Sequence, residues 1–508
     1  MWPRIAMFFA LALACQCETA IVTPRADSAA WLFMAQRQQS GEMPGRDLWD
    51  NKLPLIYLVG RAAVATGHPQ IFLWLLEAAL TAAGAVAIAR MVDHGRAHDS
   101  QSSYPATFAG ALHCIASGAT SYHAGGYMTE CYAMPLSALA ALFTLNAARS
   151  PTSQRRAVYA VLSGLMWALA VSFRLPLGLA AVGVAAVMLP QIALTGQRVS
   201  FLVCHVLGII TALMVVFVHP WMAGYLRECI DAAILWPLGI GHERIPGPLA
   251  PGAISRLGDW AQDVAKLGWL HAAAICGIIV ARREQASWIT RLVGVWYVAA
   301  LASAAWGWAS YAHYQYVALA PMCLAIGLML KGPTFSLRRR LSGALVGLTC
   351  GVVSFQAGLE LYGEVVSLSD TDRMAAVRFI ETKTRPTEPV LLWAWGRNAD
   401  ILYKLNRPTG VRHFMAHAYL DMDAGLFNEF VTEFIDAPPA WILEDTRRKK
   451  PSLSRPADPL VESRVPSLKT LRGFVATGYT RVAVYGPWSI HRLGPANASM
   501  PATQSTRP

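Results

Sequence analysis

Long runs of apolar residues dominate the first 357 residues of this chain, and short polar loops separate them. A helix needs about 20 apolar residues to cross a bilayer. Lipid offers no partners to backbone amides, so runs of this kind must form helices. On this rule we predict eleven membrane spans, at residues 5–22, 70–91, 104–119, 132–148, 157–173, 175–193, 201–220, 266–282, 287–304, 315–331 and 340–357.

The remainder of the chain differs in composition. Only 15% of all residues are charged, against about 25% in soluble domains, but residues 358–490 read like an ordinary soluble domain. "PVLLWAW" and "TRVAVYG" predict buried strands there, while "DTDRMAAVRFIETK" and "FNEFVTEFID" have helical spacing. We therefore predict a polytopic α-helical membrane domain at residues 1–357 and a small α/β domain at residues 358–490. The polar tail, residues 491–508, is predicted to be disordered.

The distribution of basic residues predicts the orientation. The net charge is +12, and many of the Arg residues lie in short loops between apolar runs. Along the chain, these Arg-containing loops alternate with loops that hold few or no basic residues. The loops around residues 120–131 and 305–314 contain no Lys or Arg. By the positive-inside rule the basic loops are cytoplasmic, and an odd number of spans then places residues 358–508 outside. The same distribution argues against a nucleic-acid-binding face.

The N-terminus allows two interpretations. Arg4 followed by "IAMFFALALAC" fits either a cleaved signal peptide or a retained first span, and the topology above uses the retained span. The nine Cys residues include no CxxC pair, which argues against zinc-ribbon and thioredoxin-type chemistry.

Two of the predicted outer loops are too long to be simple connectors. Residues 23–69 combine a helical stretch, "DSAAWLFMAQRQQSGE", with the charged motif "GRDLWDNKLPLIY". The segment "LPLIYLVGRAAVA" is too short and too basic to cross, so we expect a helix at the membrane surface. Residues 221–265 are rich in Pro and Gly, which favours a loop with one surface helix.

Acidic residues at a membrane border are costly unless something holds them, so they are functional candidates. The candidate carboxylates on the outer face are Asp27, Asp47 and Glu130. The same face holds three candidate phosphate-binding residues, Arg46, Lys52 and Arg174, and three further candidates, Tyr57, His313 and Tyr314. A carboxylate can take the proton from an attacking hydroxyl, and Arg or Lys can stabilise a phosphate leaving group. A carboxylate could instead hold a divalent cation, and the sequence does not choose between the two roles.

Structural roles compete with these assignments. A surface salt bridge is the favoured interpretation of Asp50 and Lys52, and Glu130 could cap the following helix. Arg174 could extend to the lipid headgroups, and His313 could simply be hydrogen-bonded at a helix start. Three other outer histidines lack metal-ligand spacing and are predicted to be structural: His123, His219 and His242.

The stretch "DSAAWLFMAQRQQSGEMPGRDLWDNKLPLIY" resembles the first outer loop of the GT-C membrane glycosyltransferases, a superfamily that includes protein O-mannosyltransferases, lipid A aminoarabinose transferases and lipopolysaccharide galacturonosyltransferases. Three later segments, "GGYMTECYAMP", "SYAHYQYVALAPMCLAIG" and "PVLLWAWGRNADILYKLNRPTGVRHF", are similar to family segments in the same order. The positions that match the loop motif are Asp27, Gly41, Arg46, Asp47, Lys52, Pro54 and Leu55. Gly45 departs from the family's Tyr and Leu53 from its first Pro, which bears on acceptor or lipid fit. Asp27 stands alone where the family has an acidic pair.

The resemblance implies a GT-C fold and an inverting transferase in the bacterial cytoplasmic membrane. Its donor would be a polyprenyl-phosphate sugar, and its acceptor an envelope glycolipid, a polysaccharide or a protein. Asp27 would be the base, and Asp47 would orient the acceptor or a metal. If a cation such as Mg²⁺ or Mn²⁺ is used, Asp27 or Asp47 would hold it.

Two other classes of function are weighed against this one. A transporter or flippase of lipid-linked substrates usually has inverted repeats and broken helices near the midplane. This chain shows no internal repeat, and its candidate acids lie in loops. A noncatalytic scaffold could use the outer domain alone, but it would not need the carboxylates and Arg of the first loop.

Overall fold

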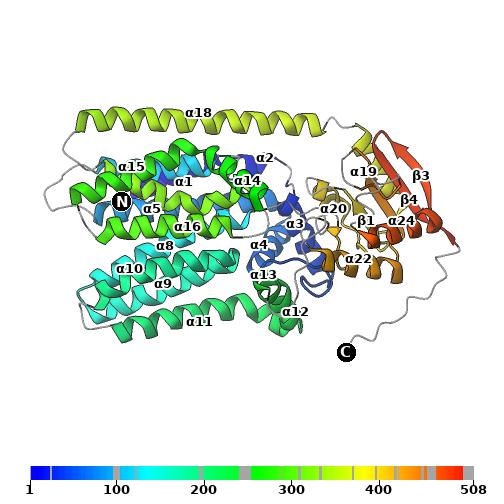
Figure 1. The fold of residues 1–508 in the computed structure, drawn as a ribbon, viewed down its shortest axis with the longest axis horizontal. Coiled ribbons are helices and arrows are strands. Elements are labelled where there is room, and N and C mark those ends of the chain that lie inside the picture. The colour runs from blue at the N-terminus through cyan, green and yellow to red at the C-terminus, as the bar shows by residue number, and fades with distance from the viewer. Residues whose placement is uncertain are drawn as a thin grey trace.

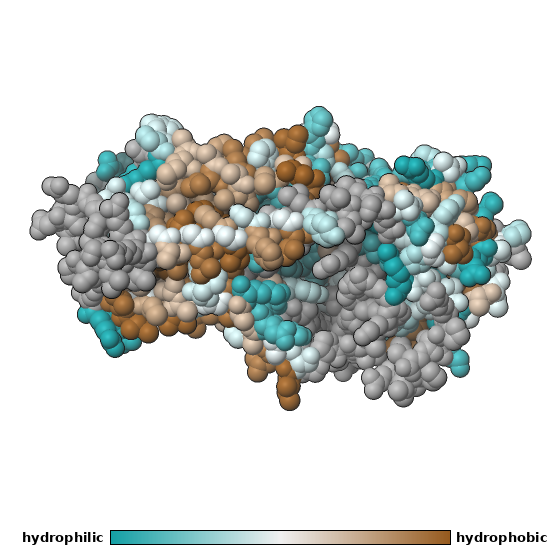
Figure 2. All heavy atoms as spheres, turned by 90° about the horizontal axis from the view of Figure 1, so that it is seen from above, coloured by the Kyte–Doolittle hydropathy of each residue, from teal (hydrophilic) through white to brown (hydrophobic). Residues whose placement is uncertain are grey.

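The computed structural model describes most of the chain: residues 2–22, 24, 26–94, 103–119, 123–193, 198–239, 253–285, 288–306, 311–330, 335–368, 371–394, 398–416, 420, 423–447, 451–454 and 465–495. Long helices run side by side at one end of the molecule, and a small sheet with its own helices forms the other end (Figure 1). The surface seen in Figure 2 is largely hydrophobic over the helical end and more hydrophilic over the end that holds the sheet.

In the described residues outside the first outer loop, the first half of the helical part contains eight helices and one short turn. These are α1 (Trp2–Cys15), α2 (Glu18–Ile21), α5 (Pro69–His94), α6 (Tyr104–Ser117), α8 (Thr129–Arg149), α9 (Ser153–Phe173), η1 (Leu175–Leu177), α10 (Gly178–Ala193) and α11 (Arg198–Met222).

The second half of the helical part runs from α12 to α18. Its elements are α12 (Leu226–Ile230), η2 (Asp231–Leu235), α13 (Trp236–Leu238), α14 (Ala253–Ala265), α15 (Gly268–Gln285), α16 (Trp288–Ala305), η3 (Ala312–Ala318), α17 (Leu319–Met329) and α18 (Phe335–Leu368).

The described residues contain fewer clear membrane spans than the sequence predicts. Seven helices are long and apolar enough to cross a membrane, and an eighth span results if α14 and α15, bent by 81°, count as one. These eight coincide with predicted spans, but the predictions at residues 5–22, 104–119 and 340–357 do not pass the same test. The count of eleven is therefore not confirmed.

The reason differs among these three. Helix α1 ends at Cys15 because Gln16 turns inward, where its amide donates hydrogen bonds to Thr81 (2.9 Å) and Ser117 (3.2 Å). Helix α6 is only 14 residues long. Helix α18 is continuous over 34 residues, and its described apolar part is Gly343–Gln356.

The first outer loop is ordered and contains the two expected helices. Helix α3 (Ala26–Gln39) covers the predicted helical stretch, and α4 (Leu55–Ala65) covers the predicted surface helix. Both lie between the long helices and the sheet domain (Figure 1).

The C-terminal part is a four-stranded mixed sheet flanked by helices. It contains α19 (Thr371–Lys383), β1 (Val390–Trp393), α20 (Ala399–Leu405), α22 (Ala424–Asp436), β2 (Trp441–Asp445), α24 (Pro466–Gly478), β3 (Tyr479–Tyr485) and β4 (Trp488–Leu493). The strand order is β1-β2-β4-β3, with β1 and β2 parallel and the other pairs antiparallel.

The two predicted strands form at the expected positions, as β1 and β3. Strands β2 and β4 were not predicted. Because β4 pairs with β2 and β3 as far as Leu493, the prediction of disorder is wrong for residues 491–493, and residues 496–508 lie outside the described part. "TRVAVYG" does form β3, but the prediction of burial was wrong, because β3 pairs only with β4 and most of its side chains are exposed at the sheet edge. Helices α19 and α22 confirm the two predicted helical segments.

The sheet domain packs directly on the first outer loop. The amide of Trp49 donates to the carbonyl of Arg412 (2.9 Å), and the Arg412 guanidinium donates to the carbonyl of Gly45 (2.8 Å). The Trp49 ring also contacts the rings of Trp236 and His413, with centroids 5.1 and 5.9 Å apart. The domain boundary predicted at residue 357 lies inside α18, which continues to Leu368, and remains a prediction.

Candidate active site

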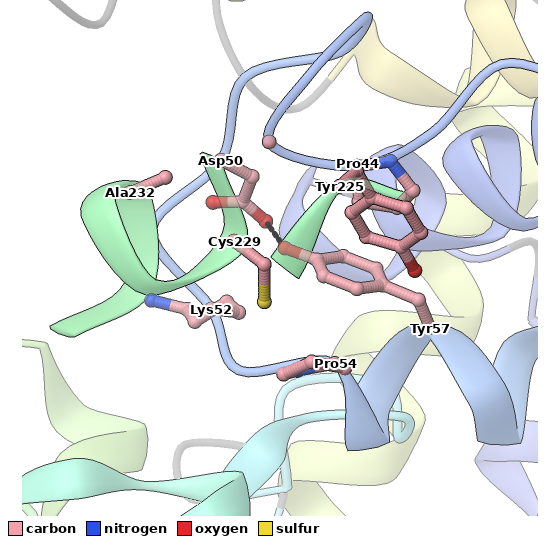
Figure 3. Close-up of a pocket in the computed structure, with 9 residues that line it drawn as sticks. Pro44, Asp50, Lys52, Pro54, Tyr57, Tyr225, Cys229 and Ala232 are labelled. Carbon is pink, nitrogen blue, oxygen red and sulfur yellow. Dashed lines mark hydrogen bonds between the residues drawn. The ribbon is translucent and has the colours of Figure 1, made fainter. Parts of the chain in front are cut away.

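Asp50 is the best-anchored carboxylate of the first outer loop. Its Oδ2 accepts hydrogen bonds from the indole of Trp31 (2.7 Å) and the hydroxyl of Tyr57 (2.8 Å), and its Oδ1 accepts one from the amide of Asn51 (2.7 Å). Figure 3 shows Asp50 and Tyr57 pointing toward each other. The expected surface salt bridge between Asp50 and Lys52 is replaced by this network, which fixes the loop that leads to Lys52.

Lys52 lies at the centre of several acidic groups. Its ammonium donates to the Asn51 side chain (3.1 Å) and lies 6.0 Å from the centre of the Trp31 ring. Burial opposes the charge of Lys52, but its surroundings outweigh burial and raise its pKa above the ordinary value. The groups that raise it are Tyr314, Asp50, Asp27 and Glu130. A lysine in this position stays charged and is suited to meeting an anionic group.

Asp27 lies in the first turn of α3, immediately after Ala26, whose φ is +47°. An alanine in the left-handed region is uncommon and costs free energy. Burial raises the pKa of the Asp27 carboxyl to about 6. The Lys52 charge lowers this pKa, whereas the charges of Asp50 and Glu130 raise it. Asp27 is therefore mostly ionised at neutral pH, yet a stronger base than an ordinary aspartate.

Glu130 and Arg174 form a buried ion pair beside Lys52. Glu130 lies in the first turn of α8, and Arg174 lies between α9 and η1. Their carboxylate and guanidinium are 1% and 7% exposed. Thr129 donates to Glu130 (3.0 Å), and the guanidinium of Arg174 lies 3.8 Å from the centre of the Tyr314 ring.

The late segment around His313 completes the cluster. The His313 ring lies 4.7 Å from the ring of Tyr314, nearly at right angles, and is stacked on Tyr311. Glu130 and Arg174 both act electrostatically on His313. The structure thus brings Asp27, Lys52, Tyr57, Glu130, Arg174, His313 and Tyr314 to one side of the molecule from five separate parts of the chain.

Two predicted site residues lie elsewhere. Arg46 and Asp47 pair with each other, with a shortest distance of 2.7 Å, and their side chains are 39% and 34% exposed. Asp47 also accepts a hydrogen bond from the amide of Met43 (2.8 Å). Neither is among the groups that act on Asp27, so their proposed roles stay predictions.

A small pocket opens next to Asp50 and Lys52. Its volume is only about 10 Å³, and it lies between the first outer loop and the segment formed by α12 and η2 (Figure 3). Its lining residues are Pro44, Gly45, Asp50, Lys52, Pro54, Tyr57, Tyr225, Cys229 and Ala232. The departure of Gly45 from the family's Tyr thus falls on the pocket wall.

The surroundings of Asp27 do not favour a divalent cation. The opposing charge that acts on its carboxylate is the Lys52 ammonium, which would repel a metal ion. Neither Asp27 nor Asp47 belongs to a metal-compatible group of three or more side chains in the described part of the chain.

Two acidic residues have surroundings that the sequence does not predict. The sequence favours a surface salt bridge between Asp50 and Lys52, because the three hydrogen-bond donors to Asp50 are not visible in it. Glu77 is fully buried in α5 and contacts His123 (3.2 Å). The signal for Glu77 was present, since it is the only acid within the predicted span at residues 70–91.

The fold has solved counterparts. ArnT from Cupriavidus metallidurans, bound to undecaprenyl phosphate, is similar with a TM-score of 0.60 and 13% identity, over 97% of this chain and 98% of that one. The Archaeoglobus fulgidus oligosaccharyltransferase, in complex with Zn and sulfate, is similar with a TM-score of 0.51 and 11% identity, over 86% of this chain and 68% of that one. No family model and no curated protein sequence matches the chain. The chain thus has the fold of the GT-C membrane glycosyltransferases, as its first outer loop suggested.

Proposed function

We propose that this multi-pass membrane protein with a GT-C fold is a glycosyltransferase that moves a sugar from a polyprenyl phosphate to an acceptor outside the cytoplasm. The observation that carries the proposal is the cluster of Asp27, Lys52 and the Glu130–Arg174 pair, which combines a raised-pKa carboxylate with two cations. The neighbouring structure of ArnT, bound to undecaprenyl phosphate, supports a donor of this chemical class.

The proposed reaction is a single displacement at the anomeric carbon. The acceptor hydroxyl attacks that carbon, its proton passes to Asp27, and the bond to the phosphate oxygen breaks, so that the anomeric configuration inverts. Polyprenyl phosphate leaves with the electron pair. A base with a pKa of about 6 is close to the working pH, which is the favourable range for proton transfer.

Lys52 and Arg174 would stabilise the phosphate as its charge grows. Electrostatic stabilisation of a leaving group is usually the largest single contribution to such catalysis. Glu130 fixes Arg174 from one side and the Tyr314 ring supports it from another, so the guanidinium is held in place before the substrate binds. His313 would tune the charge of this pair.

The location follows from the same proposal. A polyprenyl chain requires a bilayer beside the phosphate, and the basic loops predict that the cluster faces outward from a bacterial cytoplasmic membrane. Residues 358–490 would then lie outside the cytoplasm, above the first outer loop. The acceptor would be an envelope glycolipid, a polysaccharide or a protein.

Donor binding can be tested before the acceptor is known. We expect undecaprenyl phosphate to raise the melting temperature of the purified wild type. Lys52→Gln should bind the lipid with an apparent affinity at least about tenfold lower, because a charge-assisted contact is lost, and its melting temperature should rise less at the same lipid concentration. Lys383→Gln, at an exposed lysine ending α19, is the matched control and should behave as wild type. Equal shifts in all three proteins would remove Lys52 from the donor site.

A flippase of lipid-linked substrates remains the second candidate class. It would bind the same lipid but would leave the bond between sugar and phosphate intact. Mass spectrometry of envelope glycolipids and glycoproteins, from cells with and without the gene, separates the two. The transferase predicts a sugar missing from one acceptor in the deletion strain.

A further inference from the structure

A second polar cluster is buried among the long helices, apart from the candidate site. Glu77 of α5 and His123, just before α8, are completely buried, as is Cys131 in the first turn of α8. Thr19 of α2 is 3% exposed and points into the same cluster. Burying a carboxylate is costly unless a partner compensates its charge.

Three of these side chains meet in a nearly equilateral triangle. Oε2 of Glu77 lies 3.2 Å from Nε2 of His123 and 3.1 Å from Oγ1 of Thr19, and the last two atoms are 3.3 Å apart. Ligands at about 2.0–2.1 Å from a tetrahedral zinc ion are about 3.3 Å from one another. The triangle therefore has the size of one face of a tetrahedral metal site.

The three contacts of this triangle cannot all be hydrogen bonds, because too few donated hydrogens are available. With Glu77 ionised, only the Thr19 hydroxyl and one N–H of His123 can be donated, and Glu77 attracts both. The contact between Thr19 and His123 is then left without a hydrogen. An ion among the three atoms removes this conflict, because all three then serve as donors of electron pairs.

We propose that Glu77, His123 and Cys131 bind a transition-metal ion, with zinc as the best-fitting metal and the Thr19 hydroxyl as its fourth ligand. The ligand atoms of the three residues all lie within 4.8 Å of one another. A carboxylate oxygen, an imidazole nitrogen and a thiolate sulfur are ligands that zinc accepts, whereas magnesium and calcium prefer oxygen alone. This proposal does not depend on the proposed transferase activity.

Charge balance supports the assignment. Within the described part of the chain, the ion-pair partner of Glu77 is His123, and no Lys or Arg forms one with it. A divalent ion matches the charges of one carboxylate and one thiolate. The ion and its ligands would then be neutral together, while the buried carboxylate of Glu18, which also acts electrostatically on His123, adds a negative charge nearby.

The site would fasten together elements that shape the active cluster. Oε1 of Glu77 accepts a hydrogen bond from the amide of Tyr127, and the Tyr127 hydroxyl donates to the carbonyl of Ile56 (2.6 Å) in α4. Ser28, next to Asp27, donates to the carbonyl of Gly126 (2.7 Å). A metal at Glu77 would therefore support both the turn before Glu130 and the start of α3.

The test measures metal rather than turnover. The site is fully buried, so the ion must enter during folding, and the protein is purified from cells grown with added Zn²⁺ or Co²⁺. We expect one metal ion per chain in the wild type. The cobalt form should show the near-ultraviolet band of a thiolate bound to cobalt.

Cys131→Ser should lose that band and most of the metal, while Cys323→Ser, at an equally buried cysteine of α17, should keep both. Glu77→Gln keeps an oxygen for the Tyr127 amide but removes the charge, and should also lose the metal. Size-exclusion chromatography confirms that each variant is folded. A wild type purified without metal, or cobalt bound without a thiolate band, would overturn the proposal and leave a cluster of hydrogen bonds only.

Discussion

At the scale of single residues, Asp27 decides what the candidate site can do. Its carboxylate lies between a cation, Lys52, and two other acids, Asp50 and Glu130. The cation keeps it ionised at neutral pH, while burial and the acids make it more basic. An aspartate with an ordinary pKa near 4 would take a proton from a hydroxyl less readily.

The raised pKa of Asp27 predicts how stability depends on pH. Because the folded-state pKa of about 6 lies above the unfolded value, ionised Asp27 costs stability above pH 6, and the cost disappears as the pH falls toward 4. We expect Asp27→Asn to melt at a higher temperature than the wild type at pH 8. The difference should shrink at pH 5. A difference that stays constant between pH 5 and 8 would mean that the pKa of Asp27 is not raised.

The two Arg–carboxylate pairs should differ strongly in their effect on stability. Glu130→Gln leaves a buried arginine without its carboxylate, and breaking a buried pair costs about 3–5 kcal/mol. Asp47→Asn breaks a partly exposed pair, for which about 0–1 kcal/mol is expected. Thermal unfolding of both variants in one detergent provides the comparison. Equal losses would show that Glu130 and Arg174 are not paired as described.

Much of the cluster could be predicted from residue types and loop positions alone. Asp27, Lys52, Glu130 and Arg174 are charged residues next to apolar runs on the same predicted face, and the structure brings them together. Arg46 and Asp47 satisfied the same rule but pair with each other, because adjacent charges of opposite sign need no third partner. The position of a charged residue next to an apolar run does not show whether it joins the cluster or pairs with its neighbour.

At the scale of elements, the turn between α6 and α8 is the most demanding part of the site. Four consecutive residues have positive φ: Ala124 (52°), Gly125 (83°), Gly126 (83°) and Tyr127 (55°). Only glycine adopts this region without cost. The turn is stable because Glu77 binds its Tyr127 amide and Ser28 binds its Gly126 carbonyl.

Gly126 provides a direct test of this packing. A Cβ added at Gly126 would lie 2.1 Å from Oγ1 of Thr19, while one at Gly41, with a φ of +96°, would meet nothing within 4 Å. In both alanine variants the positive φ lowers the folding stability by about 1–2 kcal/mol. Gly126→Ala should lose clearly more stability in total, because of the clash with Thr19. Melting temperatures measure the difference. Equal losses would place Thr19 away from the turn.

Elements with one strong periodic signal were predicted well, and those fixed by distant partners were not. Helices α4 and α22 carry their apolar residues on one face, as their spacing indicates. Helix α1 ends at Cys15 because Gln16 finds polar partners on α5 and α6, which lie 65 and 101 residues away. Likewise, the exposure of β3 follows from its place at the sheet edge, which its own sequence does not encode.

At the scale of the whole molecule, the first outer loop joins the membrane part to the sheet domain. Trp49 stacks on His413 and meets Trp236 edge-on, and Arg412 donates to the carbonyl of Gly45. The candidate pocket lies directly below this junction, with Gly45 on its wall. A domain in this position is suited to guiding an acceptor toward Lys52 and Asp27.

The proposed orientation makes a prediction about sidedness. If the basic loops are cytoplasmic, an alkaline phosphatase fused after residue 495, beyond the end of β4, should be active, because that enzyme folds only outside the cytoplasm. A fusion in the Arg-containing loop near residue 150 should be inactive. The reverse pattern would place the candidate cluster inside the cell and exclude an extracytoplasmic transferase.

The most direct test of the central claim is the release of undecaprenyl phosphate from an undecaprenyl-phosphate sugar by the purified protein, with cell-envelope extract as acceptor. We predict release by the wild type and by Asp436→Asn, a change at an exposed residue of α22. Asp27→Asn, still folded, should lose at least about 100-fold in rate, as expected for a general base. Undiminished release by Asp27→Asn would contradict the account.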